Sequence, residues 1–183
     1  MSEIADHFAH VAGQFTQRAR AVPEGAWDNP APCEGWLARD VVRHMVEWMP
    51  ALFFDSWQIE PPQLPSVDQD PAGAWEALVN AIQLRLADPE ISKREADIRP
   101  GRYSFEQAVD MFGTGDIVIH TWDLARATGL DERLDPHEVH NLLVAMEPID
   151  EILRASGEYG ARVIVPDDSD EQTKLIAFSG RQP

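Results

Sequence analysis

The chain has 183 residues, a net charge of −17, and a sequence of which 44% is hydrophobic. This length is typical of one domain and allows roughly 70% of the unfolded surface to be buried, so we expect one unit over residues 1–183. The negative charge repels nucleic acids and anionic membrane surfaces, and neither is expected as a partner.

The cysteine content and the N-terminus exclude further classes of protein. Cys33 is the one cysteine, so an intrachain disulfide and a thiolate zinc cluster are both impossible. The first residues lack the basic and apolar regions of a signal peptide. No apolar run approaches the ~20 residues that a membrane-spanning helix needs. We therefore expect a cytoplasmic protein.

Apolar residues recur at helical spacing in five long segments and one short one. The predicted helices span residues 2–21, 36–57, 71–88, 104–129, 135–156 and 169–178. Pro50 and Pro148 each lie inside one of these helices and are expected to kink or break it. Ser104 and Gln107 form a capping box that starts the fourth helix, and Gly129 is suited to end it.

The connections between these helices are long and rich in proline and glycine. We expect an extended linker over 58–70, a charged irregular stretch over 89–103, a turn over 157–160 and a short extended segment over 162–165. Strands and helices do not alternate, and the sequence shows no internal repeat. The predicted fold class is therefore all-α, a four-helix bundle with an additional short C-terminal helix.

The fourth predicted helix carries polar side chains on the face that it should bury. On a helical wheel, Asp116 and Asp123 lie within roughly 20° of the centre of its apolar stripe, and His120 follows Asp116 by one turn. Buried polar groups are costly unless they are paired or bind a metal. Gly113 and Gly115 weaken this helix, which indicates the close approach of a neighbouring segment.

A metal ion would satisfy these polar groups. Asp116 and His120 have the i, i+4 spacing at which two ligands project side by side from one helix. A catalytic site needs about three protein ligands and an open position. His44 is the only other histidine beside the apolar stripe of a predicted core helix. Two imidazoles and one carboxylate suit Zn²⁺, Ni²⁺ or Fe²⁺. The alternative is a buried, hydrogen-bonded cluster without a metal.

Asp123 is predicted to support this site without binding the ion. We expect it to pair with Arg39 or Arg126, or to orient a ligand histidine through a hydrogen bond. Cys33 is expected to be unreactive, and the tryptophans are expected to fill the core. The remaining histidines are predicted to play no part in the site; they are His7, His10, His137 and His140.

Two segments resemble the signatures of a known family. They are Pro32-Cys33-Glu34-Gly35-Trp36 followed by Arg39-Asp40-Val41-Val42-Arg43-His44, and the stretch from Asp116 to Gly129. The chain resembles the DinB/YfiT-like metal-binding family, and within it the branch of the N-terminal domain of mycothiol-dependent maleylpyruvate isomerase. The tail from Val163 to Pro183 resembles single-domain members of that branch.

The resemblance implies a bundle of four main helices that holds a divalent metal, usually zinc or nickel, at one end. By position, the implied ligands are His44, Asp116 and His120. Characterised members use the metal to activate a low-molecular-weight thiol for transfer or isomerisation, or to hydrolyse a thiol conjugate.

The chain departs from the family pattern at two positions. The family more often has glutamate at position 116, and the shorter aspartate leaves open whether it reaches the ion directly or through water. Leu37 stands where the family commonly has a capping Ser or Thr. The additional C-terminal domain of the isomerase has no counterpart here, so maleylpyruvate isomerisation itself is not expected.

We therefore expect a divalent-metal-dependent enzyme that activates a mycothiol-like thiol for S-transfer or isomerisation of a small-molecule substrate. Two alternatives stay open: a metal-dependent hydrolase, in which the ion activates water, and a non-catalytic bundle that binds a metal or small ligand. A homodimer is also left open. The sequence does not identify the metal, the substrate or a general acid.

Overall fold

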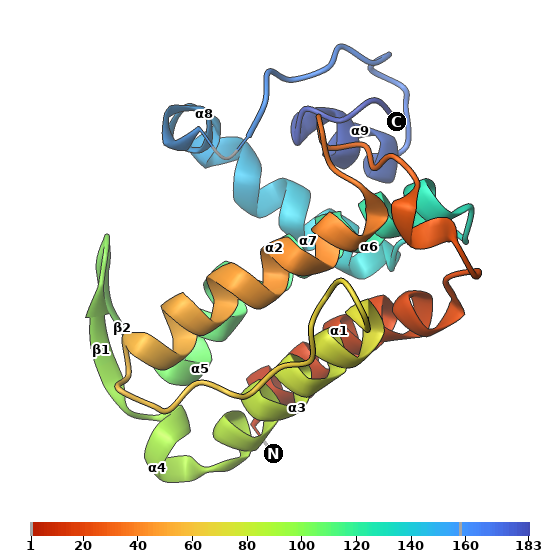
Figure 1. Cartoon of the computed structure of the whole chain (residues 1–183). Helices are drawn as coiled ribbons and strands as arrows, with labels where there is room; N and C mark the ends of the chain where they lie inside the picture. The colour runs from red at the N-terminus through yellow and green to blue at the C-terminus, as the bar shows by residue number, and fades with distance from the viewer. Residues whose placement is uncertain (1, 158) are drawn as a thin grey trace.

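The computed structural model describes residues 2–157 and 159–183 and is mostly α-helical. Its long helices are α1 (Glu3–Ala21), α2 (Ala38–Pro50), α3 (Pro71–Ala87) and α6 (Gly115–Thr128). Helix α1 packs against α3 and α6, and α2 packs against the same two helices (Figure 1). The predicted all-α helical bundle is therefore confirmed.

The helix starts follow from capping residues in the sequence. The side chains of Ser2 and Asp70 accept hydrogen bonds from the backbone N–H three residues later, at 3.2 and 2.8 Å. Helix α2 has no capping hydroxyl at Leu37, and Asp40 Oδ2 accepts the Leu37 N–H instead, at 2.9 Å. Trp36 therefore belongs to the preceding loop, and the helix begins two residues later than the sequence predicts.

Two of the predicted helices contain wide π-type turns. Helix α2 ends at Pro50 and continues as η2 (Ala51–Asp55), because a proline cannot donate the backbone hydrogen bond of a regular helix. The fourth predicted helix consists of α5 (Phe105–Ala108), the π-type η3 (Val109–Thr114) and α6. Such turns have wider hydrogen bonds than an α-helix and shift the helical register between the segments on either side.

The fifth predicted helix is broken at Pro148, as expected. It consists of α7 (Pro136–Met146), the 3₁₀ turn η4 (Glu147–Ile149) and α8 (Asp150–Ser156). Residue 158, within the predicted turn over 157–160, lies outside the described residues.

The prediction of an irregular stretch over 89–103 is wrong. This segment forms a short helix, α4 (Pro89–Ser92), and an antiparallel hairpin of β1 (Glu95–Ile98) and β2 (Gly101–Ser104). Each strand has four residues, which is too short for a clear alternation of polar and apolar side chains. The hairpin lies at the end of the bundle away from the C-terminus (Figure 1).

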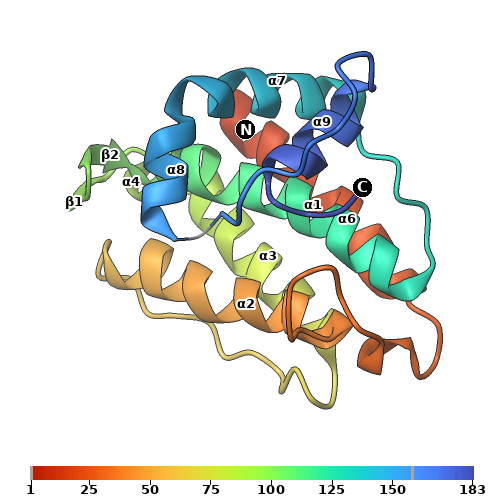
Figure 2. The same cartoon turned by 90° about the horizontal axis from the view of Figure 1, so that it is seen from above.

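The last predicted helix is α9 (Glu171–Phe178). Helix α7 packs against both α6 and α9, so the C-terminal helices cover one side of the bundle (Figure 2). The preceding segment 162–165 is bonded to α9 by Val163 N–H, which donates to Ala177 O at 2.9 Å. This segment is not assigned as a strand.

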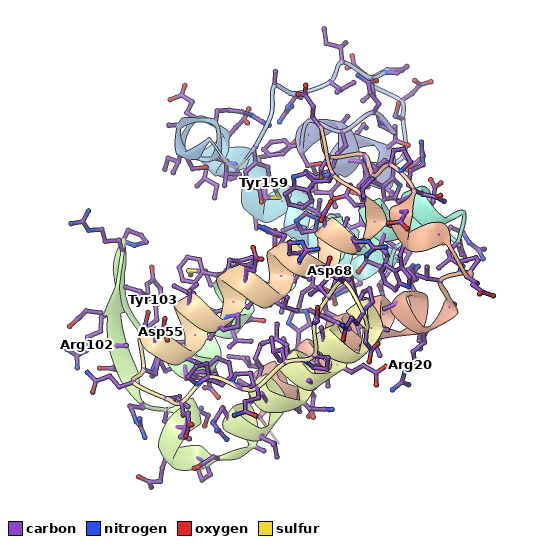
Figure 3. The ribbon with its side chains drawn as sticks, viewed as in Figure 1. Arg20, Asp55, Asp68, Arg102, Tyr103 and Tyr159 are labelled. Carbon is purple, nitrogen blue, oxygen red and sulfur yellow. The ribbon has the colours of Figure 1, made fainter. Side chains whose placement is uncertain are left out.

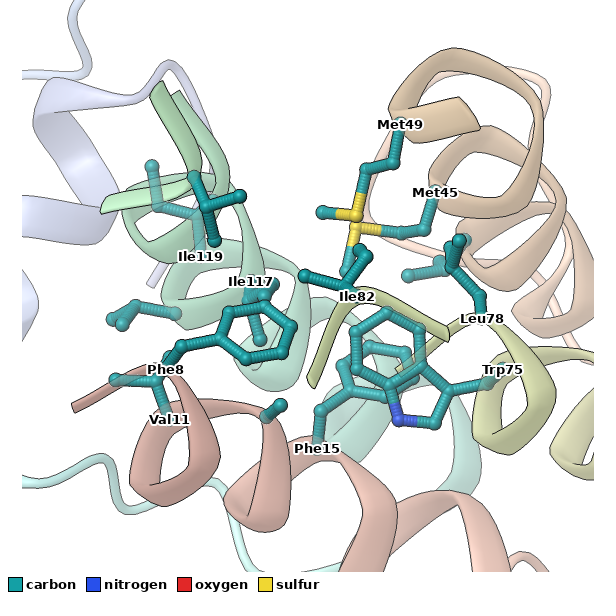
Figure 4. Close-up of a cluster of buried hydrophobic side chains, with 14 of the residues drawn as sticks. Phe8, Val11, Phe15, Met45, Met49, Trp75, Leu78, Ile82, Ile117 and Ile119 are labelled. Carbon is teal, nitrogen blue, oxygen red and sulfur yellow. The ribbon is translucent and has the colours of Figure 1, made fainter. Parts of the chain in front are cut away.

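The core lies between the bundle helices, where side chains from all four point toward one another (Figure 4). Phe15 of α1 packs on Trp75 of α3 with ring centroids 4.6 Å apart, and the indole Nε1 of Trp75 donates to Thr16 Oγ1 at 2.9 Å. The expected close approaches are present as well. A Cβ at Gly115 would lie 2.9 Å from Leu142 Cδ1, and one at Gly113 would lie 3.3 Å from the Phe53 ring. Across the described chain, no helix combines the length and apolar character that crossing a membrane requires.

His7 fastens α1 to two other elements. Its Nδ1 lies 2.7 Å from Asp110 Oδ1 on η3, and its Nε2 lies 2.9 Å from Glu138 Oε2 on α7. Burial lowers the pKa of His7, but the hydrogen bonds and charges of Glu138 and Asp110 outweigh burial and raise this pKa above its usual value of 6.5. This histidine therefore has a structural role.

The raised pKa of His7 predicts a pH-dependent contribution to stability. Such a group stabilises the fold below its unfolded pKa and loses this contribution as the pH rises through its folded pKa. We expect His7→Gln to lower the free energy of unfolding more at about pH 5.5 than at about pH 8.5, as measured by urea denaturation. His137→Gln, at an exposed position of α7, is the control. A loss in His7→Gln that is equal at both pH values would contradict the prediction.

Candidate metal centre

Helices α2 and α6 bring His44, Asp116 and His120 to one place. His44 Nε2 lies 3.3 Å from Asp116 Oδ2, and His120 Nε2 lies 3.4 Å from Asp116 Oδ1. The three residues offer one donor atom each, and these atoms all lie within 4.8 Å of one another. The structure therefore brings the three residues together, and their role as metal ligands stays a prediction.

The geometry of this set fits a shared divalent cation. Both imidazole–carboxylate distances, 3.3 and 3.4 Å, exceed the roughly 2.9–3.0 Å of a typical N–H···O hydrogen bond. Donor atoms that bind one zinc ion at about 2.0–2.2 Å with tetrahedral angles lie about 3.3–3.6 Å apart. Two imidazole nitrogens and a carboxylate are also the donor types that Zn²⁺ and Ni²⁺ accept. The shorter side chain of Asp116 thus still brings its oxygens to both histidines.

The Nδ1 atom of His120, on the side of the ring away from Asp116, is hydrogen-bonded to a buried carboxylate. Its Nδ1 lies 2.8 Å from Asp123 Oδ2, and both residues are buried, with exposed fractions of 4% and 0%. A carboxylate bonded to one ring nitrogen of a histidine fixes the orientation and tautomer of the ring, which leaves the other nitrogen available to a metal. Asp123 itself is paired with Arg181, whose Nη2 donates to Oδ2 at 2.7 Å.

The predicted pairing of Asp123 with Arg39 or Arg126 is wrong. Arg39 Nη2 donates to Asp28 Oδ1 at 2.5 Å, and Arg126 Nε lies 2.7 Å from Glu132 Oε1. The carboxylates of Asp28 and Glu132 are both more exposed than the fully buried Asp123. The alternative prediction, that Asp123 orients a histidine, agrees with its hydrogen bond to His120.

Two tryptophans border the site, although the sequence predicts them only as core residues. Trp48 Nε1 donates to Asp116 Oδ2 at 3.1 Å. The ring of Trp36 lies 5.2 Å from the ring of His44 and 5.9 Å from that of His120, measured between centroids. Two features of the sequence could have placed these tryptophans at the site. Trp48 follows His44 by one helical turn, and Trp36 belongs to the motif that precedes α2.

The electrostatics of the cluster follow from burial and close opposite charges. Burial raises the pKa of Asp116, but His120 and His44 outweigh burial and hold this pKa well below its usual range. Burial lowers the pKa of His120, but Asp116 and Asp123 raise it to about 9. For Asp123, the effect of burial is likewise outweighed by His120 and Arg181, which lower the pKa of this carboxyl group.

Cys33 lies beside this cluster but is not activated. Its Sγ lies 3.5 Å from Asp123 Oδ2 and 3.4 Å from Arg181 Nη2. Burial and the charge of Asp123 raise the pKa of this thiol to about 12, although Arg181 opposes them. The thiol is therefore neutral at physiological pH, as expected for an unreactive cysteine.

An open pocket of about 430 Å³ adjoins the three donor side chains. It is lined by Pro32, Cys33, Glu34, Trp36, His44, Asp116, Ile119, His120, Tyr159, Gly160, Ser179, Gly180 and Arg181. The walls thus come from the loop before α2, from α2 and α6, and from two C-terminal segments. Tyr159 lies on the same side of α2 as α9 and the C-terminus (Figure 3). The sequence predicted neither Tyr159 nor Arg181 as part of the site.

Comparison with known families bears on this geometry. Residues 8–52 match the family model of the mycothiol maleylpyruvate isomerase N-terminal domain. The predicted family resemblance is confirmed. The matched segment contains most of α1, all of α2 and His44, whereas Asp116 and His120 lie outside it. The match points to a mycothiol-related, DinB-like metal-binding family.

Two curated proteins are similar to most of the chain. Both are uncharacterised proteins of Mycobacterium tuberculosis, one from strain CDC 1551 / Oshkosh and one from strain ATCC 25618 / H37Rv. Each is 25% identical over 154 residues, which cover 83% of this chain and 83% of the relative. No solved structure matches the chain significantly.

Proposed function

We propose that this protein is a divalent-metal-dependent enzyme that activates a low-molecular-weight thiol of the mycothiol type for S-transfer or isomerisation. The observation that carries the proposal is the cluster of His44, Asp116 and His120 within 4.8 Å of one another at the wall of an open pocket. The match of residues 8–52 to a mycothiol-related domain supports the choice of thiol.

The chain's own residues have distinct tasks in this proposal. Zinc or nickel held by the three ligands would act as a Lewis acid that lowers the pKa of a thiol bound beside it. Asp123 keeps Nδ1 of His120 engaged, so that Nε2 faces the pocket. Trp48 holds Asp116 in place through its indole N–H.

The nucleophile in this proposal comes from outside the chain. Cys33 is the one cysteine of the sequence, and its pKa of about 12 keeps it neutral. The pocket of about 430 Å³ gives a small thiol and a small electrophile room to lie side by side beside the ligands. Holding two reactants together in this way favours their reaction.

The proposal is tested by metal analysis and a thiol assay on protein purified without a histidine tag. We expect wild type to contain about one divalent ion per chain. When mycothiol is supplied, we expect wild type to accelerate the reaction of its thiol with an electrophile. We expect His44→Ala to lose both properties, because the ion loses one of three ligands. His140→Ala, an exposed histidine paired with Glu171, is the matched control and should retain both.

The same experiment distinguishes the proposal from its alternatives. Metal-bound wild type that leaves thiols untouched would contradict thiol activation and would favour a hydrolase or a binding protein. Wild type that takes up no metal would contradict the metal centre itself. Equal metal content in wild type and His44→Ala would remove His44 from the ligand set.

A further inference from the structure

The C-terminal tail delivers a guanidinium group to the carboxylate behind His120. Arg181 Nε donates to Asp123 Oδ1 at 2.9 Å, and Nη2 donates to Oδ2 at 2.7 Å. Two parallel bonds of this kind fix both the position and the rotation of a carboxylate. The same Oδ2 accepts the hydrogen bond of His120 Nδ1 at 2.8 Å. A continuous path of hydrogen bonds thus runs from the tail to a ligand histidine.

The tail is built to hold Arg181 at this point. The backbone N–H of Arg181 donates to Ile176 O at 3.2 Å, and that of Gly180 donates to Ala177 O at 3.1 Å. Gly180 has a φ of +88°, and a Cβ at this position would lie 3.0 Å from backbone atoms of Gly160. Only glycine fits such a close approach with a left-handed backbone.

A second arginine, Arg154, bonds both to the segment at Gly160 and to the end of α9. Arg154 of α8 donates to Gly160 O, and its Nη2 donates to Phe178 O at 2.5 Å. Its guanidinium also lies 4.8 Å from the centroid of the Phe178 ring. The end of α9 and the segment at Gly160 are therefore held together, and the backbone that carries Arg181 is fixed next to the pocket.

We propose that Arg181 is a positioning residue of the metal centre, which acts on His120 through Asp123. This inference rests on the proposed function. Without Arg181, Asp123 would lose the two bonds that fix its rotation. Its carboxylate could then turn away from His120. The Nε2 of His120 would then lose the orientation and tautomer that a metal needs. The C-terminal tail is accordingly part of the site and not only a cover over it.

The test is a double-mutant cycle on the untagged full chain, with zinc affinity measured by competition against a chromophoric chelator. We expect Arg181→Gln and Asp123→Asn each to weaken zinc binding about 10- to 100-fold. Because Arg181 acts through Asp123, the double variant should bind zinc no more weakly than Asp123→Asn alone. Arg133→Gln removes the same charge at a side chain that is 87% exposed, and should leave the affinity unchanged.

The outcomes separate positioning from a merely structural role. Losses that add in the double variant, or an unchanged affinity in Arg181→Gln, would overturn the inference and leave the proposed function standing. Wild type that binds no zinc would overturn both. Should Arg181→Gln fail to fold, Arg181→Lys takes its place, because lysine keeps the charge but cannot form two parallel bonds to one carboxylate. Zinc affinity of Arg181→Lys equal to that of wild type would then overturn the inference.

Discussion

Replacing His120 by alanine is expected to weaken zinc binding about 100- to 1,000-fold. Zinc held by four ligands in small domains contributes about 10–16 kcal/mol, so one ligand corresponds to about 2.5–4 kcal/mol. Of the two proposed histidine ligands, His120 has its other ring nitrogen hydrogen-bonded to the buried carboxylate of Asp123, so its loss would remove an oriented donor. The measurement is a zinc titration of untagged protein, with helical content checked by circular dichroism.

The matched control for this variant is His10→Ala. His10 lies on α1, its Nε2 is 3.0 Å from Asp135 Oδ2, and its side chain is 48% exposed. Its removal should leave zinc affinity unchanged. If His120→Ala retained its fold and bound zinc as tightly as wild type, His120 would have no place among the ligands.

The largest expected loss of stability is that of Trp75→Ala, at about 3–5 kcal/mol. Trp75 is fully buried between α1 and α3, and its removal leaves a cavity beside Phe15. It also removes the donor that bonds to Thr16 Oγ1. Because small domains are stable by only about 5–15 kcal/mol, such a loss shifts the urea midpoint strongly.

Leu84→Ala on the same helix is the control for this prediction. Leu84 is 65% exposed, so its truncation should change the free energy of unfolding by at most about 0.5 kcal/mol. Equal and small losses of stability in the two variants would contradict the prediction that Trp75 is a central residue of the bundle core. Both residues lie on α3, so the comparison sets a buried side chain against an exposed one on the same helix.

The sequence predicts the cluster of His44, Asp116 and His120 because each of these residues lies on a regular helix. On a helix, the face that a residue occupies follows from its spacing to neighbouring apolar residues. A polar residue beside the apolar stripe of one helix is therefore expected to face the polar residues of another. Packing of α2 against α6 then brings the three residues together.

The role of Arg181 could not be predicted in the same way. Arg181 lies 58 positions after Asp123 and reaches it only because the tail bends at Gly180 against the backbone of Gly160. No periodic pattern encodes such a path. The predicted pairing of Asp123 with Arg39 or Arg126 was wrong for a related reason, since both arginines meet other carboxylates, Asp28 and Glu132, whose positions the sequence does not reveal.

The π-type turns and the hairpin were missed because their local signals are weak. The turn over Val109–Thr114 continues a helical pattern and changes only its register. The strands of four residues are too short to be told from an irregular connection. By contrast, the capping box of Ser104 and Gln107 and the break at Pro148 each follow from one or two residues, and these were predicted correctly.

The most direct test of the metal centre is anomalous X-ray diffraction from crystals of untagged protein loaded with zinc. We expect one strong anomalous peak within about 2.0–2.2 Å of a nitrogen of His44, a carboxylate oxygen of Asp116 and Nε2 of His120. An ion bound elsewhere, or a zinc-free cluster in which the two histidines are bonded to different neighbours, would contradict the proposal that these three side chains share one cation.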